Sequence, residues 1–455
     1  MEGNVTELLR YALDEIESLE DYYNVQEKDV EEHVSKEIKK YLLGVLLDRF
    51  FAREVYKSDD ITLSDEEIEL VSKIVKDFNL EEKEDGVCLS YRLNEERIPK
   101  GMETNPTKAR REFAKLIQQP EILRESMLMM LLVKFEESIS GVYRFLLSNY
   151  PQAYLSEKSI TYSELVSLNS DIGEIRERFI EREIDEFMRM PISDWYAAFK
   201  KKHKATFSFD SGEFDEFKEI YYRRNIIVHN RGIVNEIYIN NVLKSDKQVG
   251  DEIEVDEEYL INSFSLTKII LIGSFWGLRK VSKDESELEK MLFEYGYNCM
   301  VDKQWNIAKY IYSILLENEE QEDMDLLCER INRWIAIKNS EGLDKIKEEI
   351  EKLDVSAMKT QFSVAKYALL DEFEKVTLYL DEAIGSEMPV WCIKEWPLLN
   401  QYRESDEYIT FAEKHAEQFK EEGYEPSKEI MENDSDIALE LEESFSKSFD
   451  EIEEG

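Results

Sequence analysis

Residues 121–150, EILRESMLMMLLVKFEESISGVYRFLLSNY, decide the fold class of this chain. Apolar residues recur at helical spacing along the stretch, and the segment 127–133 is apolar nearly all round. A helix of this kind is covered by protein on most of its faces. The stretch therefore predicts one long helix that is central to a helical bundle.

Three further helices complete the predicted bundle over residues 119–284. Helical spacing indicates one helix over 161–189 and another over about 214–228. The fourth follows Asp256, which can cap it and is itself preceded by a short extended piece at 252–255. Four helices of this length are enough for a small bundle.

Residues 1–118 are predicted to form a separate, mostly helical N-terminal region. Helical spacing covers 5–56, and Ser64 stands at the start of a capped helix. Alternating apolar residues over 87–93 indicate a single short strand. The stretch 100–108, which contains glycine and proline, is interpreted as the linker that closes this region.

Residues 285–420 contain a weak helical-pair repeat. When Trp305 is aligned with Phe373, the apolar positions after each of them align as well. The offset between these two residues is about twice the 34-residue period of tetratricopeptide-type helical pairs. A middle pair would run through 326–337 and 346–353. An irregular helical domain is the alternative interpretation.

The final stretch, residues 421–455, is an acidic tail with a net charge of −12. Such tails are usually solvated or disordered. Apolar residues spaced along it leave an amphipathic docking segment as a second interpretation. A third is that the tail imitates RNA and covers a basic site.

The overall composition restricts the function classes. The 455 residues include 58 Lys and Arg against 101 Asp and Glu, for a net charge of −43. An apolar fraction of 42% excludes global disorder. The acidity argues against a protein that coats nucleic acid generally, because the average surface would repel it. A local basic site remains compatible with this composition.

The sequence also predicts a cytoplasmic protein without a membrane segment. The N-terminus lacks the basic start and apolar run of a secretion signal, and the longest apolar run, 269–278, is too short to span a bilayer. Reduced cysteines are expected, because the four cysteines lie far apart and form no CxxC pair: Cys88, Cys299, Cys328 and Cys392. Phosphate-loop, HExxH and GxSxG motifs are absent, and we expect no metal and no cofactor.

One short segment carries a chemical motif, YYRRNIIVHNRG at residues 221–232. Arg224 is followed directly by Asn225, and His229 comes five residues after the arginine. An arginine at this distance from a histidine is common by chance. The apolar anchor 226–228 and the asparagine and glycine after the histidine, which are natural helix terminators, make this context more specific.

This segment resembles the HEPN family, whose motif is an arginine, a polar residue, a few further positions and a histidine. The resemblance covers about residues 119–284, and it implies a mainly α fold. In this fold a central four-helix HEPN-like bundle is flanked by the helical N-terminal region and by the tetratricopeptide-like C-terminal region. It further implies metal-independent RNA cleavage, with Arg224, Asn225 and His229 of two protomers meeting across a homodimer interface.

The chemistry of these residue types agrees with that implication. RNA carries its own nucleophile, the 2′-hydroxyl group, so an enzyme needs only proton transfer and charge stabilisation. His229 can transfer a proton near neutral pH, and Arg224 can stabilise the phosphate as its charge builds. Asn225 shares a helix face with His229 and can contact the phosphate or the imidazole. Arg224 and His229 would point about 140° apart on a regular helix. They converge only if the helix ends or bends between them, or if a second protomer supplies one of them.

A locally basic stretch surrounds the motif. Residues 195–231 carry a net charge of +3 within this acidic chain. We expect RNA contacts from Lys200, Lys201, Lys202, Lys204, Arg223, Asn230 and Arg231, with Trp195, Tyr196, Phe199 and Phe207 near enough to stack a base. The alternatives are a solvated lysine face and a His229 that only caps helix carbonyls.

Two functions follow from the sequence. The first is a dimeric, regulated endoribonuclease that leaves a cyclic phosphate, acting as a toxin or antiphage-defence effector and controlled by an antitoxin or sensor protein. The second is a HEPN-type and helical-repeat interaction protein that binds RNA, nucleotide or a partner protein without cutting. A purely structural helical adaptor is a third interpretation.

Overall fold

The computed structural model describes residues 4–57, 61, 63–83, 86–152, 159–167, 171–203, 207, 209, 211–242, 247–282, 284–317 and 323–421. The chain is 76% helix and 5% strand, which confirms the predicted mainly α fold class. It divides into two compact units, residues 1–285 and 286–455. Lys204 and the acidic tail from residue 422 onwards lie outside the described residues.

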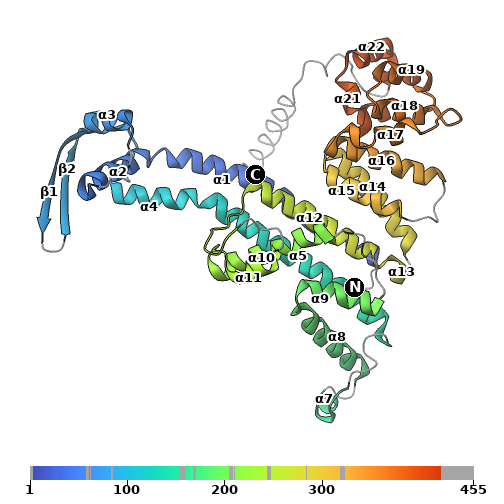
Figure 1. The fold of residues 1–455 in the computed structure, drawn as a ribbon, viewed down its shortest axis with the longest axis horizontal. Helices are drawn as coiled ribbons and strands as arrows, with labels where there is room; N and C mark the ends of the chain where they lie inside the picture. The colour runs from blue at the N-terminus through green and yellow to red at the C-terminus, as the bar shows by residue number, and fades with distance from the viewer. Residues whose placement is uncertain are drawn as a thin grey trace, which may run out of the picture. The chain divides into compact units, whose positions relative to one another are not determined.

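The first unit begins with a helix of 34 residues, α1 (Val5–Ile38), capped by the Asn4 side chain. This helix packs along α5 (Gln119–Asn149) and α12 (Glu257–Trp276), as Figure 1 shows. Its apolar stripe, including Leu9 and Ile16, is fully buried. We expected a separate region to end near residue 118, but α1 belongs to the same compact unit as the helices that follow. The physical reason is that its apolar stripe is covered by α5 and α12.

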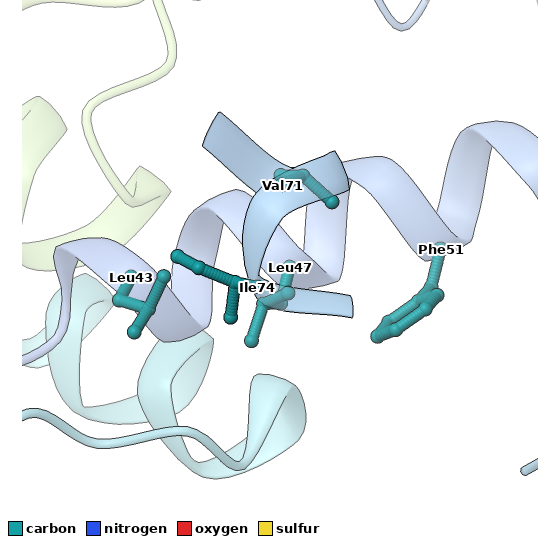
Figure 2. Close-up of a cluster of buried hydrophobic side chains, with 5 residues drawn as sticks. All are labelled: Leu43, Leu47, Phe51, Val71 and Ile74. Carbon is teal, nitrogen blue, oxygen red and sulfur yellow. The ribbon is translucent and has the colours of Figure 1, made fainter. Parts of the chain in front are cut away.

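The rest of the N-terminal region forms a small second core. It comprises α2 (Leu42–Tyr56), α3 (Asp65–Ile74), β1 (Val75–Lys83), β2 (Gly86–Leu93) and α4 (Pro106–Ile117). Figure 2 shows the core side chains contributed by α2 and α3, which are Leu43, Leu47, Phe51, Val71 and Ile74. The predicted cap is confirmed, because Ser64 and Glu67 form a reciprocal capping box. The predicted strand is β2, and its antiparallel partner β1, rich in charged residues, was not predicted.

The helices after α5 match the predictions in part. The helix expected over 161–189 is two helices, α7 (Tyr162–Ser167) and α8 (Ile172–Met188). It is followed by α9 (Ile192–His203), which was not predicted, and by α10 (Ser211–Asn230), α11 (Glu236–Asn241), α12 and α13 (Arg279–Ser282). The long helix α5 is confirmed, and it contacts α1, α4, α8, α10 and α12. It is not covered all round, however, because Met130 and Val133 are 41% and 39% exposed.

The helix that is buried nearly all round is α12. The predicted cap is confirmed, because Asp256 Oδ1 accepts a hydrogen bond from the Tyr259 N–H at 2.7 Å. The segment Glu257–Val281 is long and apolar enough to cross a membrane, but 78% of its most apolar window is buried inside the protein. We therefore interpret α12 as a core helix of the first unit.

The second unit is built from short helices. They are α14 (Glu285–Val301), α15 (Trp305–Leu315), α16 (Asp323–Glu341), α17 (Lys347–Glu351), α18 (Thr360–Leu369), α19 (Phe373–Ala383), α20 (Val390–Glu395), α21 (Asn400–Arg403), α22 (Asp406–Lys414) and α23 (Ala416–Glu421). The offset seen in the sequence recurs in the geometry. Helices α15 and α19 begin at Trp305 and Phe373, and the same offset separates the last residues of α14 and α18. It also separates Lys303 and Asp371, which the turns before α15 and α19 hold at φ 60° and 58°.

Candidate active site at the end of helix α10

Helix α10 carries the motif and runs unbroken to Asn230. The chain then turns sharply, with Arg231 and Gly232 both in the left-handed region at φ 55° and 75°. The Gly232 N–H donates to the Ile226 carbonyl at 3.2 Å, and its own carbonyl accepts from the Ile253 N–H at 2.8 Å. Asn230 and Gly232 therefore end the helix, as their residue types predicted.

Replacing Gly232 tests how strictly this turn is required. A Cβ at this position would lie 3.2 Å from the Ile253 carbonyl oxygen, and its positive φ is unfavourable for any L side chain. We expect Gly232→Ala to lower the free energy of unfolding by about 1–2 kcal/mol, measured by urea unfolding. The control is Gly141→Ala on α5, where a Cβ meets nothing within 4 Å and should be neutral or stabilising by up to about 1 kcal/mol. Equal effects at both positions would contradict the strained turn.

A small apolar cluster supports the end of α10. Ile226 packs with Val234, Tyr238 and Ile253 from the segments that follow the helix. The sequence suggested that all three residues 226–228 anchor the motif. Only Ile226 is buried, and Val228 is 53% exposed. The anchor is therefore a single residue, because a helix directs consecutive side chains to different sides.

Arg224 lies against α5. Its Nη2 is 3.1 Å from Oε1 of Glu136, and its guanidinium lies 5.4 Å above the ring of Tyr221. Tyr221 is 8% exposed, and burial, together with the negative charge of Glu136, raises the pKa of its hydroxyl well above the ordinary value. Arginine, carboxylate and phenol thus form one compact group, which we call the Arg224 cluster: Glu136, Tyr221 and Arg224.

His229 and Asn225 lie on a different side of α10 from Arg224. Both are exposed, and their spacing of four residues places them on one face of the helix. Because α10 is one continuous helix through both Arg224 and His229, regular helix geometry places the two side chains about 140° apart around the axis. The helix therefore does not end between the two residues, which was one of the ways in which Arg224 and His229 of one protomer could converge.

Arg223, which we expected to bind RNA, is used inside the protein. Its Nε donates to Oε1 of Glu219 at 2.8 Å, its Nη1 donates to the Glu254 carbonyl at 2.7 Å, and its guanidinium stacks 3.7 Å from the Tyr259 ring. The hydroxyls of Tyr238 and Tyr259 donate to the same carboxylate at 2.6 and 2.7 Å. This network joins α10 to α11 and α12, so Arg223 is better explained as a structural residue.

The lysine run lies far from His229 along the chain. Lys200 and Lys201 are exposed near the end of α9, and Lys200 Nζ lies 5.9 Å from the centre of the Phe207 ring, just before α10 begins. His229 lies near the last residue of α10, about 27 Å along a regular helix axis from the first. Lys202 belongs to α9 as well. The lysines and His229 therefore mark opposite ends of α10 within one protomer.

The aromatic residues expected to stack a base are mostly core residues. Trp195, Tyr196 and Phe199 are 3%, 5% and 2% exposed, and the Tyr196 hydroxyl is 2.9 Å from Ser274 Oγ. The expectation that they contact RNA is wrong, because they occupy the buried face of α9. Phe207 is half-buried.

The two residues that follow His229, Asn230 and Arg231, lie at the end of α10. The Asn230 side-chain amide donates to the Ile233 carbonyl and so stabilises the turn. Arg231 is exposed. Among the described residues, no three His, Cys, Asp or Glu side chains are grouped so that they could hold a metal ion. The local chemistry is thus that of an exposed imidazole, an amide and a partly exposed guanidinium.

Comparison with protein-family models, curated proteins and solved structures gives no significant match to this chain. The functional argument therefore rests on the motif and on the geometry described above.

The site residue that sequence reasoning missed is Glu136. It is one of 101 acidic residues, and its neighbour Glu137 is also a glutamate, so no local pattern distinguishes it. Only the packing of α5 against α10 places it beside Arg224.

Proposed function

We propose that this protein is a metal-independent endoribonuclease of HEPN type, with a site built from Arg224, Asn225 and His229 of two protomers. The observation that carries the proposal is the exposure of His229 and Asn225, side by side, at the open end of α10. An exposed imidazole with an adjacent amide is free to meet a phosphate. The arginine of the same motif lies on another side of the helix, so it is suited to act on the partner's site.

In the proposed reaction the 2′-hydroxyl of RNA attacks the adjacent phosphorus, and the bond to the 5′-oxygen of the next nucleotide breaks. The attacking 2′-hydroxyl gives up one proton and the leaving 5′-oxygen gains one, and His229 carries out one of these two proton transfers. Arg224 stabilises the charge that builds on the phosphate, and Asn225 orients the phosphate or the imidazole. The products are a 2′,3′-cyclic phosphate and a free 5′-hydroxyl group, with atoms and charge balanced without any metal.

Exposed apolar side chains near the motif support a protomer contact. Val228 lies between the motif residues on α10 and is 53% exposed, and Met130 and Val133 are exposed on α5, within two turns of Glu136. If these side chains of α10 and α5 form one patch, that patch is typical of an interaction surface. We propose that the homodimer forms over this part of the first unit.

We also propose that the nuclease is a regulated, cytoplasmic toxin or antiphage-defence effector. A metal-independent ribonuclease would damage its own cell unless it were controlled. The second unit is compatible with this role, because the turns at Lys303 and Asp371 recur at the offset expected of a helical-pair repeat, and stacked repeats offer extended surfaces for protein partners. We propose that the helices of this unit pack as tetratricopeptide-like pairs, and that an antitoxin or sensor protein binds to them.

The alternative function is an interaction protein that does not cut RNA. The same recurring turns in the second unit favour it, because a helical-repeat surface can act alone as the binding site. In that case the bundle would bind RNA, nucleotide or a partner protein without catalysis.

Cleavage of labelled RNA in EDTA separates the two functions. We expect the wild type to cut and to leave a cyclic phosphate, and His229→Ala and Arg224→Ala each to reduce the rate by at least about 100-fold, because each removes a group that acts in the transition state. The matched control is His33→Ala, which removes another exposed helical histidine, on α1, and should change nothing. A folded wild type that cuts no RNA in any of these assays would favour the interaction protein.

A further inference from the structure

We propose that Glu136 of α5 is a positioning residue for Arg224. It holds the guanidinium in one orientation, so that the remaining N–H groups are directed to an RNA phosphate. This inference rests on the proposed ribonuclease function and adds a residue, outside the motif, on which that function depends. It joins two segments of the chain that are 88 residues apart.

The contacts around Arg224 define its orientation from two sides. On one side the guanidinium makes a cation–π contact with the Tyr221 ring, 5.4 Å from the ring centre. That ring is itself fixed, because Phe135, Phe217 and Trp195 lie edge-on to it with centroids 6.2, 5.6 and 6.3 Å away. On the other side Oε1 of Glu136 accepts a hydrogen bond from Nη2 at 3.1 Å. A flexible side chain with these two contacts has lost much of its rotamer freedom before any RNA binds.

The bond to Glu136 uses only one of the N–H donors of the guanidinium. Arginine has five N–H donors, and a single carboxylate oxygen occupies one of them. Nε of Arg224 is buried and has no hydrogen-bond partner within the described part of the chain. The side chain as a whole is 27% exposed. The cation is therefore anchored through Nη2 and still partly exposed, so that a phosphate would be bound by the remaining N–H groups of Nη1 and Nη2 and not by the buried Nε.

The neighbouring Arg223 is an arginine of the same helix whose guanidinium is bound by other groups of the protein. It makes two hydrogen bonds, to Glu219 and to the Glu254 carbonyl, and stacks at 3.7 Å on Tyr259. Its side chain is 15% exposed. Within the described part of the chain Arg224 makes one side-chain hydrogen bond and is more exposed, so of these two adjacent arginines it is the better placed to bind a ligand.

Steady-state cleavage kinetics of the full chain test the proposal. We expect Glu136→Ala to lower kcat about 10- to 100-fold, with KM changed by less than about 3-fold, because a misplaced group costs rate more than binding. Glu136→Gln keeps an oxygen that can accept from Nη2 and should recover most of that loss. The matched control is Glu137→Ala, next in the chain, 63% exposed and paired with Lys134, which should cleave like the wild type.

A double variant shows whether Glu136 acts through Arg224. If it does, Glu136→Ala combined with Arg224→Ala should be no slower than Arg224→Ala alone, since non-additivity is the mark of a shared role. A merely structural role would instead lower the rate of both backgrounds equally. Equal cleavage rates for Glu136→Ala, Glu137→Ala and the wild type would overturn the positioning role of Glu136. The proposed ribonuclease function would not be affected by that result. Faster cleavage by both Glu136 variants would also overturn the positioning role, because Glu136 would then inhibit the reaction.

Failure of the ribonuclease proposal gives a different pattern. If the wild type cuts no RNA, binding of 2′-O-methyl RNA to the same variants becomes the readout. Weaker binding by Arg224→Ala and by Glu136→Ala, restored by Glu136→Gln, would still support the positioning role. Binding that is unaffected by Glu136→Ala, or no binding by the wild type, would overturn it.

Discussion

Mixing two inactive variants, Arg224→Ala and His229→Ala, is expected to restore RNA cleavage. In a mixed dimer one protomer supplies an intact arginine and the other an intact histidine, so one of the two shared sites is complete. With random assembly, half of the dimers are mixed and each has one working site, which gives about a quarter of the wild-type rate. The reason is geometric: Arg224 lies against α5 while His229 is exposed on another side of the same unbroken helix.

The measurement is cleavage of labelled RNA in EDTA after the two variants have exchanged protomers, with exchange verified by co-purification of differently tagged chains. Each variant alone is the control and should stay inactive. A variant that carries both substitutions, mixed with the wild type, should add no activity. Mixed dimers that form but do not cut would show that Arg224 and His229 do not act across an interface.

Removing Glu20 is expected to cause the largest loss of stability. Lys268 of α12 is fully buried, and its ammonium is paired with Glu20 of α1 at 2.6 Å. Without Glu20 the buried ammonium of Lys268 keeps only a more distant carboxylate partner on α1, because Glu17 Oε1 is 4.0 Å from it. We expect Glu20→Ala to lower the free energy of unfolding of the first unit by about 3 kcal/mol.

Urea unfolding of the full chain, with hydrogen exchange of α1 and α12 to assign the transition, measures this loss. Glu17→Ala is the matched control. It removes a more exposed and more distant carboxylate of the same helix, and should cost less than about 1 kcal/mol. Combining Glu20→Ala with Lys268→Met removes the buried charge and should recover most of the stability. If Glu20→Ala costs no more than Glu17→Ala, the ion pair does not hold α1 to the bundle.

Local patterns predicted local structure well. The capping box at Ser64, the cap at Asp256, the long helix α5 and the turn after Asn230 all depend on residues within a few positions of one another. Backbone conformation and hydrogen bonding within a turn are set by such near neighbours. The offset between Trp305 and Phe373 was visible for the same reason, since the turns at Lys303 and Asp371 are each formed by residues close together in the chain.

Patterns of charge and aromaticity predicted much less. Arg223 stands beside Arg224 in the sequence, yet it is bonded inside the protein while Arg224 remains partly exposed. Trp195, Tyr196 and Phe199 follow the spacing of a core face as readily as that of a binding face, and they proved to be buried. Which of two neighbouring side chains is used internally depends on the helices that pack against them. Those helices come from distant parts of the chain.

The sequence was therefore sufficient for the mainly helical class, for the helix ends at Ser64, Asp256 and Asn230, and for the position of the Arg224, Asn225 and His229 motif on one helix. It was not sufficient for the attachment of α1 to α5 and α12, for the burial of Lys268, or for the pairing of Glu136 with Arg224. The physical reason is the range of the interactions. Caps and helical periods join residues a few positions apart, whereas the two ion pairs join residues 88 and 248 positions apart, and only the folded chain brings them together.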